Sequence, residues 1–270
     1  MFPLPFRWDL TRRNHLGSLV QGEQAESYAA FLDHILSCCS RVLAFTSDSD
    51  LIFVGRSPES IFDHLSGLLF DSSWFDRLEL LHFSMRFLKE IDVRQDHPES
   101  INAMRAYLHN LGLHPEGIAT RDRPVTFIDL VTSGETFGRL VTFLRNWTTE
   151  IEYDWKAVKR RIRLIGITEK TKTSPKTWRW QQQVSWVSLL ANRSVKNVSV
   201  PRELWQYPGN YQDKVTLSYT PARWGDPELS LPGYSDSQLK ALRFAYHLFE
   251  LGRTKERRKQ FVSLLVKEPR

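Results

Sequence analysis

The sequence predicts an α/β fold in which a mostly parallel sheet carries helices on both faces. Short apolar runs at 51–55, 125–129 and 161–168 are typical of buried strands. Segments with helical spacing of apolar residues separate these runs, and strands that alternate with helices favour right-handed crossovers and parallel pairing. With 270 residues, the chain is long enough for one large domain or for one domain with a substantial appendage.

The predicted elements follow in chain order. Residues 24–43 and 61–69 have the spacing of amphipathic helices on either side of the first strand. Residues 78–87 are compatible with a strand or with a helix end. Pro98 and Ser100 begin a helix that Gly112 stops, and a further helix precedes the strand at 161–168.

The residue composition and the spacing of apolar residues change near residue 171. We therefore predict a core of residues 1–170 and a cap of residues 171–270. A polar loop leads into a Trp-rich helix, and residues 196–200 are a short strand candidate. The segment 201–234 is rich in Pro, Gly and aromatic residues, which is typical of an ordered but irregular cap. Two helices, at 236–251 and 255–266, close the chain.

Charge is distributed unevenly. Residues 1–150 carry 14 basic and 20 acidic side chains (14 − 20 = −6), and residues 151–270 carry 23 and 11 (23 − 11 = +12). The basic half fits a partner or substrate rich in phosphate, and it fits a solvated basic surface equally well. The basic cluster KERRK at 255–259 makes nucleic acid a possible partner but favours a solvated helix face.

Other features narrow the class of protein. The longest apolar runs are far shorter than the roughly 20 residues of a membrane helix, and the N-terminal residues lack a signal-peptide core, so we expect a cytoplasmic protein that does not bind a membrane. The two cysteines, Cys38 and Cys39, are adjacent, and we expect them to be buried small side chains rather than a disulfide or a metal site. The histidines show no ligand-like pairing. Asp63 and His64 are expected on an exposed helix face.

The stretch VTFIDLVTSGETFGRL at 125–140 carries the clearest functional signal. An apolar strand ends on Asp129, a polar turn follows, and then a helix begins. The turn contains Thr132, Ser133, Gly134, Glu135 and Thr136. Hydroxyl groups and unpaired backbone N–H groups at a helix start bind anions, and a glycine lets backbone approach the ligand closely. The turn therefore predicts a phosphate-binding loop, with Glu135 directed to solvent, although strand–turn–helix units commonly carry such residues as helix caps.

An apolar strand, an acid and Thr-Ser-Gly-x-Thr resemble the phosphoribosyl-diphosphate-binding motif of type I phosphoribosyltransferases. The resemblance implies that Asp129 holds ribose hydroxyls or Mg²⁺ and takes part in catalysis, and that residues 132–136 bind the 5′-phosphate. Two positions depart from the motif. Ile128 replaces the first of two acids, and Thr132 stands where the loop often begins with an acid.

A second stretch, FVGRSPES at 53–60, resembles the diphosphate-binding loop of the same family. In that comparison Arg56 is the cation that faces the diphosphate leaving group, and Ser57 is a hydrogen-bond donor beside it. The order of the two loops also fits the architecture, and so does the position of Arg56, which is 73 residues upstream of Asp129 (129 − 56 = 73).

The segment after the 161–168 strand lies where members of this family begin to recognise the acceptor, commonly a nucleobase. The aromatic and basic candidates in it are Lys170, Lys172, Trp178, Arg179 and Trp180. Tryptophan rings could stack on a flat base, and the cations could face phosphate or carbonyl groups. The tryptophans are equally typical of a packed cap core.

Three functions remain open at this point. The first is a phosphoribosyltransferase that uses phosphoribosyl diphosphate and Mg²⁺. The second is a non-catalytic sensor of a phosphorylated ribose compound or nucleotide, which Ile128 favours. The third is a sugar-isomerase-type phosphosugar domain, because the stretches at 54–57 and 133–136 also resemble its Ser-rich loops. Homodimers are common in the transferase family, so a homodimer is possible.

Overall fold

The computed structural model describes residues 7–46, 48–85, 90–170, 179–224 and 232–268. Its centre is a five-stranded, all-parallel sheet with the strand order β2-β1-β3-β4-β5, which confirms the predicted fold class. The strands are β1 (Asp50–Val54), β2 (Leu78–Leu81), β3 (Val125–Leu130), β4 (Ile162–Glu169) and β5 (Val195–Val200). The ambiguous segment 78–87 therefore supplies the edge strand β2.

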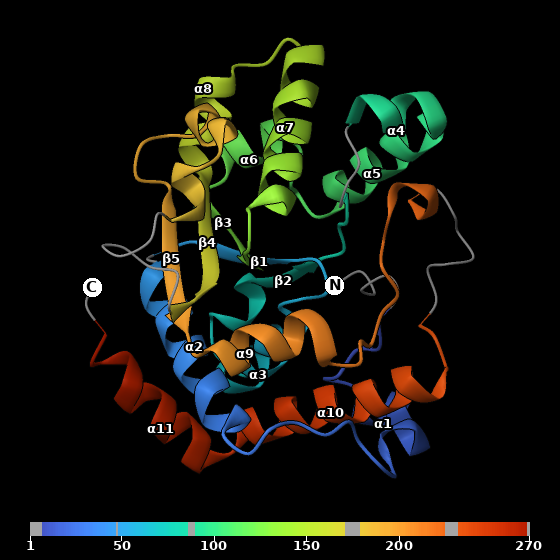
Figure 1. The fold of residues 1–270 in the computed structure, drawn as a ribbon, viewed down its shortest axis with the longest axis vertical. Coiled ribbons are helices and arrows are strands. Elements are labelled where there is room, and N and C mark those ends of the chain that lie inside the picture. The colour runs from blue at the N-terminus through green and yellow to red at the C-terminus, as the bar shows by residue number, and fades with distance from the viewer. Residues whose placement is uncertain (1–6, 47, 86–89, 171–178, 225–231, 269–270) are drawn as a thin grey trace.

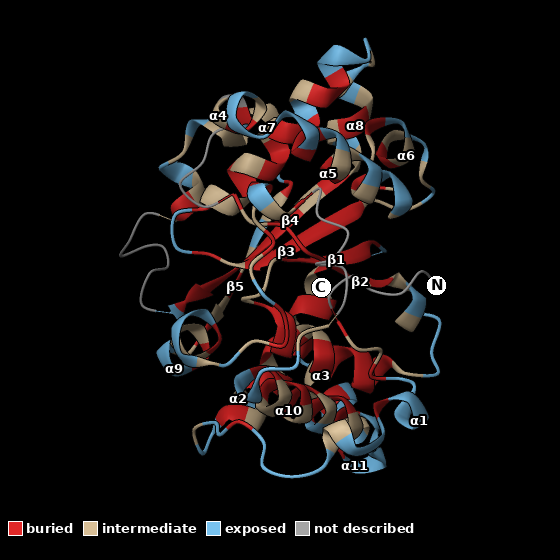
Figure 2. Cartoon of the chain, turned by 90° about the vertical axis from the view of Figure 1, so that its right-hand side faces the viewer, coloured by how far each residue is buried: buried red, intermediate tan, exposed pale blue. Residues whose placement is uncertain are grey.

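Helices cover both faces of the sheet (Figure 1). One layer contains α2 (Phe31–Thr46), α3 (Glu59–Leu69), α9 (Arg202–Gln206), α10 (Asp236–Arg253) and α11 (Lys255–Leu265), with the short α1 (Arg13–Leu16) beside α10. The other contains α4 (Glu90–Asp96), α5 (Pro98–Asn110), α6 (Pro115–Thr120), α7 (Glu135–Glu150) and α8 (Trp155–Arg161). Figure 2 shows the buried sheet enclosed between these two layers.

The alternation of side chains along each strand divides the core in two. Phe53, Ile128 and Ile165 pack against the layer that contains α2 and α3. Phe127 and Leu164 pack against the layer that contains α7. Both faces are apolar, which explains why the strands read as continuous apolar runs in the sequence.

Two predicted helices differ from the observed elements. α2 begins at Phe31 rather than near residue 24. Residues 23–28 form no helix, and the N–H of Ala25 donates to the Lys240 carbonyl on α10 at 3.2 Å. The predicted Trp-rich helix is instead two 3₁₀ turns, Trp180–Gln182 and Ser185–Leu189. Its indole rings are used for packing on α7, as described below.

Residues after 170 complete the sheet and one of its helical layers. β5 pairs with β4, and α10 crosses α3 with close backbone contact. At this crossing a Cβ atom on Gly67 would lie 2.0 Å from the Phe249 carbonyl oxygen, and one on Gly252 would lie 2.7 Å from the His64 carbonyl oxygen. The two helices can approach this closely only because both positions are glycine.

Asp63 and His64 are buried, contrary to the prediction that they lie on an exposed helix face. Arg7 forms two hydrogen bonds of 2.6 Å with the Asp63 carboxylate, and His64 Nδ1 lies 2.9 Å from the Leu248 carbonyl oxygen. The face of α3 that carries them is covered by the N-terminal segment and α10, which a local sequence pattern does not reveal. Cys38 and Cys39 are buried and free, as predicted.

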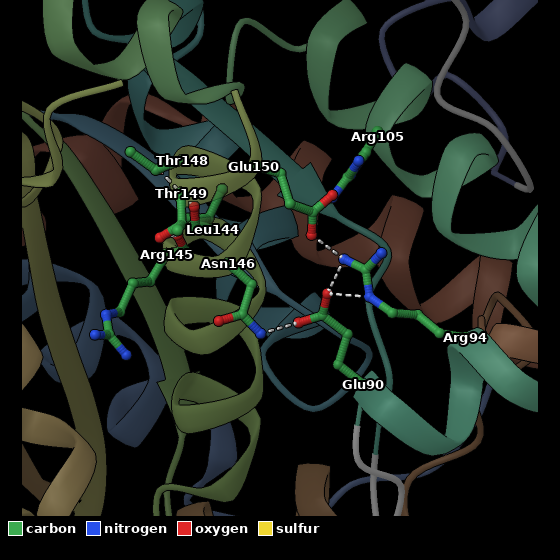
Figure 3. Close-up of polar contacts among 9 residues, drawn as sticks. All are labelled: Glu90, Arg94, Arg105, Leu144, Arg145, Asn146, Thr148, Thr149 and Glu150. Atoms are coloured by element: carbon green, nitrogen blue, oxygen red, sulfur yellow. Dashed lines mark hydrogen bonds and ion pairs between the residues drawn. The ribbon is translucent and has the colours of Figure 1, made fainter. Parts of the chain in front are cut away.

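A polar network joins α4 and α5 to the carboxyl-terminal end of α7 (Figure 3). Glu90 accepts hydrogen bonds from Arg94 at 3.0 Å and from Asn146 at 2.8 Å. Arg94 also contacts Glu150, which accepts a bond of 2.6 Å from Arg105. This network links three helices of the same layer. Among the described residues, no helix has the length and apolar content needed to cross a bilayer.

Candidate functional site

The strand order creates a switch point between β1 and β3. The chain leaves β1 toward the layer with α3 and leaves β3 toward the layer with α7, so the loops after these neighbouring strands diverge. Ligands of open α/β sheets bind in the crevice at such a point, beyond the carboxyl ends of the strands. A pocket of about 330 Å³ lies there, and both predicted loops contribute to it through Ser57 and residues 129–137.

The loop after β3 forms the polar wall of the pocket. Its hydroxyl-bearing residues Thr132, Ser133 and Thr136 line the pocket together with Gly134 and Glu135. Gly134 is the N-cap of the 16-residue helix α7, and no side chain caps the first turn. The first N–H groups of a helix lack intrahelical partners, so this end of α7 offers donors and a positive dipole to an anion.

Gly134 is required at its position for two reasons. Its φ of 77° lies in the left-handed region, and a Cβ atom there would approach the Trp180 ring to 2.3 Å. Trp180 is buried, stacks on Trp186 with ring centroids 5.8 Å apart, and donates from Nε1 to Asn197 at 2.7 Å. The loop after β3 therefore rests on an indole ring that is itself held by a hydrogen bond and a stacked ring.

Asp129 is a buried acid at the base of the pocket. Burial raises its pKa to about 8, although hydrogen bonds from Leu130 N–H and the Thr136 hydroxyl and the charge of Lys214 oppose the shift. The neighbouring Ile128 is fully buried in the core beneath the sheet. The position where the family motif has its first acid is thus a core position in this chain.

Arg56 lies beside the pocket but is half-buried against another loop. Its Nη1 donates to the Thr216 carbonyl at 3.3 Å, and the Thr216 hydroxyl donates to Glu59 at 2.7 Å. Burial lowers the pKa of Arg56, while Glu59 raises it. Ser57, by contrast, lines the pocket directly.

The cap segment contributes residues that the sequence pattern does not identify. Trp205, Gly209 and Asn210 line the pocket, and Trp205 Nε1 donates to the Val131 carbonyl at 3.3 Å. Lys214 is half-buried and donates to the Pro208 carbonyl at 2.5 Å. Burial lowers the pKa of Lys214 to about 8. Only the aromatic, Pro- and Gly-rich composition of the segment signals a cap, and it does not say which residues face a ligand.

The predicted acceptor-binding residues are divided between several places. Trp180 is buried behind the loop rather than on the pocket lining, and Arg179 borders a different cavity beside β5. Lys170 is exposed at the end of β4. Lys172 and Trp178 fall outside the described residues.

The fit of Mg²⁺ depends on Asp129. The described residues contain no group of three His, Cys, Asp or Glu side chains arranged to hold a metal ion. Mg²⁺ commonly binds through one or two carboxylates together with substrate phosphates and water. A magnesium ion here would therefore be held by Asp129 and by phosphate oxygens of the ligand.

The comparisons add no family to this picture. No protein-family model, curated protein or solved structure matches the chain.

Proposed function

We propose that the switch-point pocket binds a phosphorylated ribose compound, such as phosphoribosyl diphosphate or a nucleotide. The phosphate would lie in the loop 132–136, and the ribose hydroxyls would contact Asp129. The observation that carries this proposal is the start of α7, which has no side-chain cap and faces the pocket. Thr132 and Ser133, just before the helix, line the same pocket, and the buried Asp129 lies at its base.

Binding without catalysis is the function that the geometry supports best. Ile128 is buried in the core, so Asp129 has no adjacent second acid to share the ribose or a metal. Arg56, the candidate cation for a leaving group, donates instead to the backbone of Thr216. These two features favour a sensor or regulatory module over an enzyme.

Transfer of the ribosyl phosphate is the second candidate, and one feature favours it. The charge of Arg56 lowers the pKa of Lys214, so the two cations lie close together, and Glu59 raises the pKa of both. Lys214 also lies close enough to Asp129 to lower the pKa of that carboxyl. Two cations could stabilise diphosphate as it leaves with the electron pair of the C1–O bond, while a nitrogen of the acceptor forms the new bond to C1. Bound Mg²⁺ would supply additional charge neutralisation to the diphosphate.

Thermal stabilisation by ligands tests the binding proposal. Phosphoribosyl diphosphate with Mg²⁺ and ribose 5-phosphate should each raise the Tm of the full chain, because they bind the folded state only. A hexose phosphate is the matched ligand for the sugar-isomerase alternative. A shift with the hexose phosphate and none with either ribose compound would reject the proposal.

Diphosphate release separates the two candidate functions. The chain would be incubated with phosphoribosyl diphosphate, Mg²⁺ and a panel of nucleobases. Binding without diphosphate release supports the sensor. Release that depends on one base, and that the substitution Arg56→Ala abolishes, supports the transferase.

A further inference from the structure

A second cavity of about 290 Å³ lies at the opposite end of the sheet from the switch-point pocket. It is formed at the amino ends of β3, β4 and β5 and by the end of α2. Thr126 is paired with Arg163 in the parallel register, and Ile165, two residues further along β4, is paired with Lys196. All four side chains therefore emerge on the same face of the sheet.

Cations dominate the lining of this second cavity. Arg160, Arg163, Arg193 and Lys196 all contribute to it, and no acidic residue is among its described lining residues. None of these four cations forms an ion pair within 4.0 Å in the part of the chain that the structure describes. Lys196 donates to the Phe45 carbonyl at 2.9 Å, and burial together with the charge of Arg163 lowers its pKa. Like charges are thus held together without a neutralising acid from the described part of the chain.

Two buried hydroxyl groups in the same lining also lack partners. Thr126 is 1% exposed and Ser194 is 8% exposed, and neither Oγ atom has a hydrogen-bond partner among the described residues. Buried polar groups are normally paired, because an unpaired group loses its hydration without compensation. Hydroxyls without a partner beside cations without an acidic partner, both among the described residues, point to a ligand that accepts hydrogen bonds and carries negative charge.

We propose that this second cavity binds a phosphate group through Arg163, Lys196, Thr126 and Ser194. The phosphate would belong either to a small phosphorylated molecule or to the backbone of a nucleic acid, since both present the same acceptor oxygens. A neighbouring cavity of about 990 Å³ shares Phe45 and Lys196 with the first and has Arg41 and Arg179 in its lining. It gives room for the rest of the ligand beside strand β5. This inference does not depend on the proposed function of the switch-point pocket.

Calorimetric titration of the full chain with inorganic phosphate tests the proposal. The double substitution Arg163→Gln, Lys196→Gln should remove one phosphate-binding event and leave any event at the switch-point pocket unchanged. Arg145→Gln is the control for loss of positive charge outside the cavity. It removes one positive charge, against two in the double variant, from an exposed position on α7, where the guanidinium has no partner among the residues drawn (Figure 3). The switch-point variant Thr132→Val, Ser133→Ala should show the opposite pattern, so a failure of one site is distinguishable from a failure of the other.

Thr126→Val separates ligand binding from folding. The valine has nearly the same shape and removes an unpartnered hydroxyl, so the Tm should stay the same or rise. Phosphate affinity should nevertheless fall by about tenfold, the usual effect of losing one hydrogen bond to a charged group.

A parallel titration with a ten-nucleotide single-stranded DNA without terminal phosphates identifies the source of the phosphate. Binding of this DNA that salt weakens steeply, and that the Arg163, Lys196 variant loses, assigns the site to nucleic acid.

Binding of inorganic phosphate alone assigns the second cavity to a small phosphorylated molecule. Two results would overturn the proposal. In the first, Arg163→Gln, Lys196→Gln and Thr126→Val bind inorganic phosphate and the oligonucleotide as tightly as Arg145→Gln does. In the second, none of these variants binds either ligand.

Discussion

At the scale of single residues, Gly134 links the sequence motif to the pocket. Its left-handed φ and its contact with the Trp180 ring both require the absence of a side chain. The same residue begins α7 and so presents the first N–H groups of the helix to the pocket. A substitution of Gly134 would therefore change the folding of the loop and the proposed phosphate binding together.

Gly134→Ala should lower the free energy of unfolding by about 2–4 kcal/mol, because a left-handed alanine and the displaced Trp180 ring each add strain. Gly209→Ala is the control from the same pocket lining, since no atom lies within 4 Å of its added Cβ. Urea unfolding followed by circular dichroism measures both. Equal stability of the two variants would show that the Trp180 contact is not formed.

Asp129 should make the stability of the protein depend on pH. Its pKa in the folded state is about 8, above the ordinary value of 3.8 for an aspartate. Between these two pH values the folded state keeps a proton that the unfolded state has released. The contribution of Asp129 to stability is therefore greatest at low pH and decreases as pH rises from about 4 to about 8.

Asparagine at position 129 cannot release a proton when the protein unfolds. The Asp129→Asn variant should therefore gain stability relative to the wild type as pH rises, by an amount on the order of a few kcal/mol near pH 8. Guanidinium unfolding of both proteins at several pH values gives this difference. A difference that stays constant between pH 4 and pH 8 would mean that Asp129 is ionised in the folded state.

The sequence locates the polar loop and Asp129 because these residues follow one strand and precede one helix. It does not locate Lys214, Trp205 or Asn210, whose positions depend on how a distant irregular segment folds back over the loop. It also does not show that Ile128 is a core side chain on the far face of the strand. Local patterns predict local geometry, and these residues reach the site through tertiary contacts.

At the scale of elements, the crossing of α3 and α10 depends on Gly67 and Gly252. Alanine normally stabilises a helix relative to glycine by about 0.5–1 kcal/mol. Gly67→Ala should instead destabilise the protein by about 2–4 kcal/mol, because its Cβ would overlap the backbone of Phe249. Thermal unfolding measures the change in Tm. A higher Tm for Gly67→Ala than for the wild type would contradict the close crossing of the two helices.

Element boundaries were predictable where the local signal was complete. Pro98 at the start of α5 and the apolar runs of β1, β3 and β4 have such signals, and the structure follows them. The Trp-rich segment failed as a predicted helix because its rings pack onto Gly134 and Gly138, the latter with its added Cβ 2.6 Å from Trp186 Nε1. Packing against another element outweighed the local apolar spacing.

At the scale of the whole molecule, the parallel sheet separates two polar regions. The switch-point pocket lies at the carboxyl ends of the strands, and the basic cavity lies at their amino ends. The excess positive charge of residues 151–270 is consistent with the second region, since Arg160, Arg163, Arg193 and Lys196 all come from that half. The sequence count revealed the bias but not the face on which these side chains meet.

The Arg7–Asp63 pair attaches the N-terminal segment to the body of the molecule and is buried on both sides. Arg7→Met should lower the free energy of unfolding by about 3–5 kcal/mol, because it leaves a buried carboxyl without its partner. The double variant Arg7→Met, Asp63→Leu should recover most of this loss. A double-mutant cycle by urea unfolding measures the coupling, and additive effects would exclude a direct interaction.

The most direct test of the central proposal is the Kd of phosphoribosyl diphosphate, measured by calorimetry with Mg²⁺ present. The wild type and the exposed control Ser263→Ala should bind alike, and Thr132→Val, Ser133→Ala should bind at least about tenfold more weakly because two donors to the phosphate are lost. Absence of binding by the wild type, or an unchanged Kd in the double variant, would contradict the assignment of the loop 132–136 as a phosphate site.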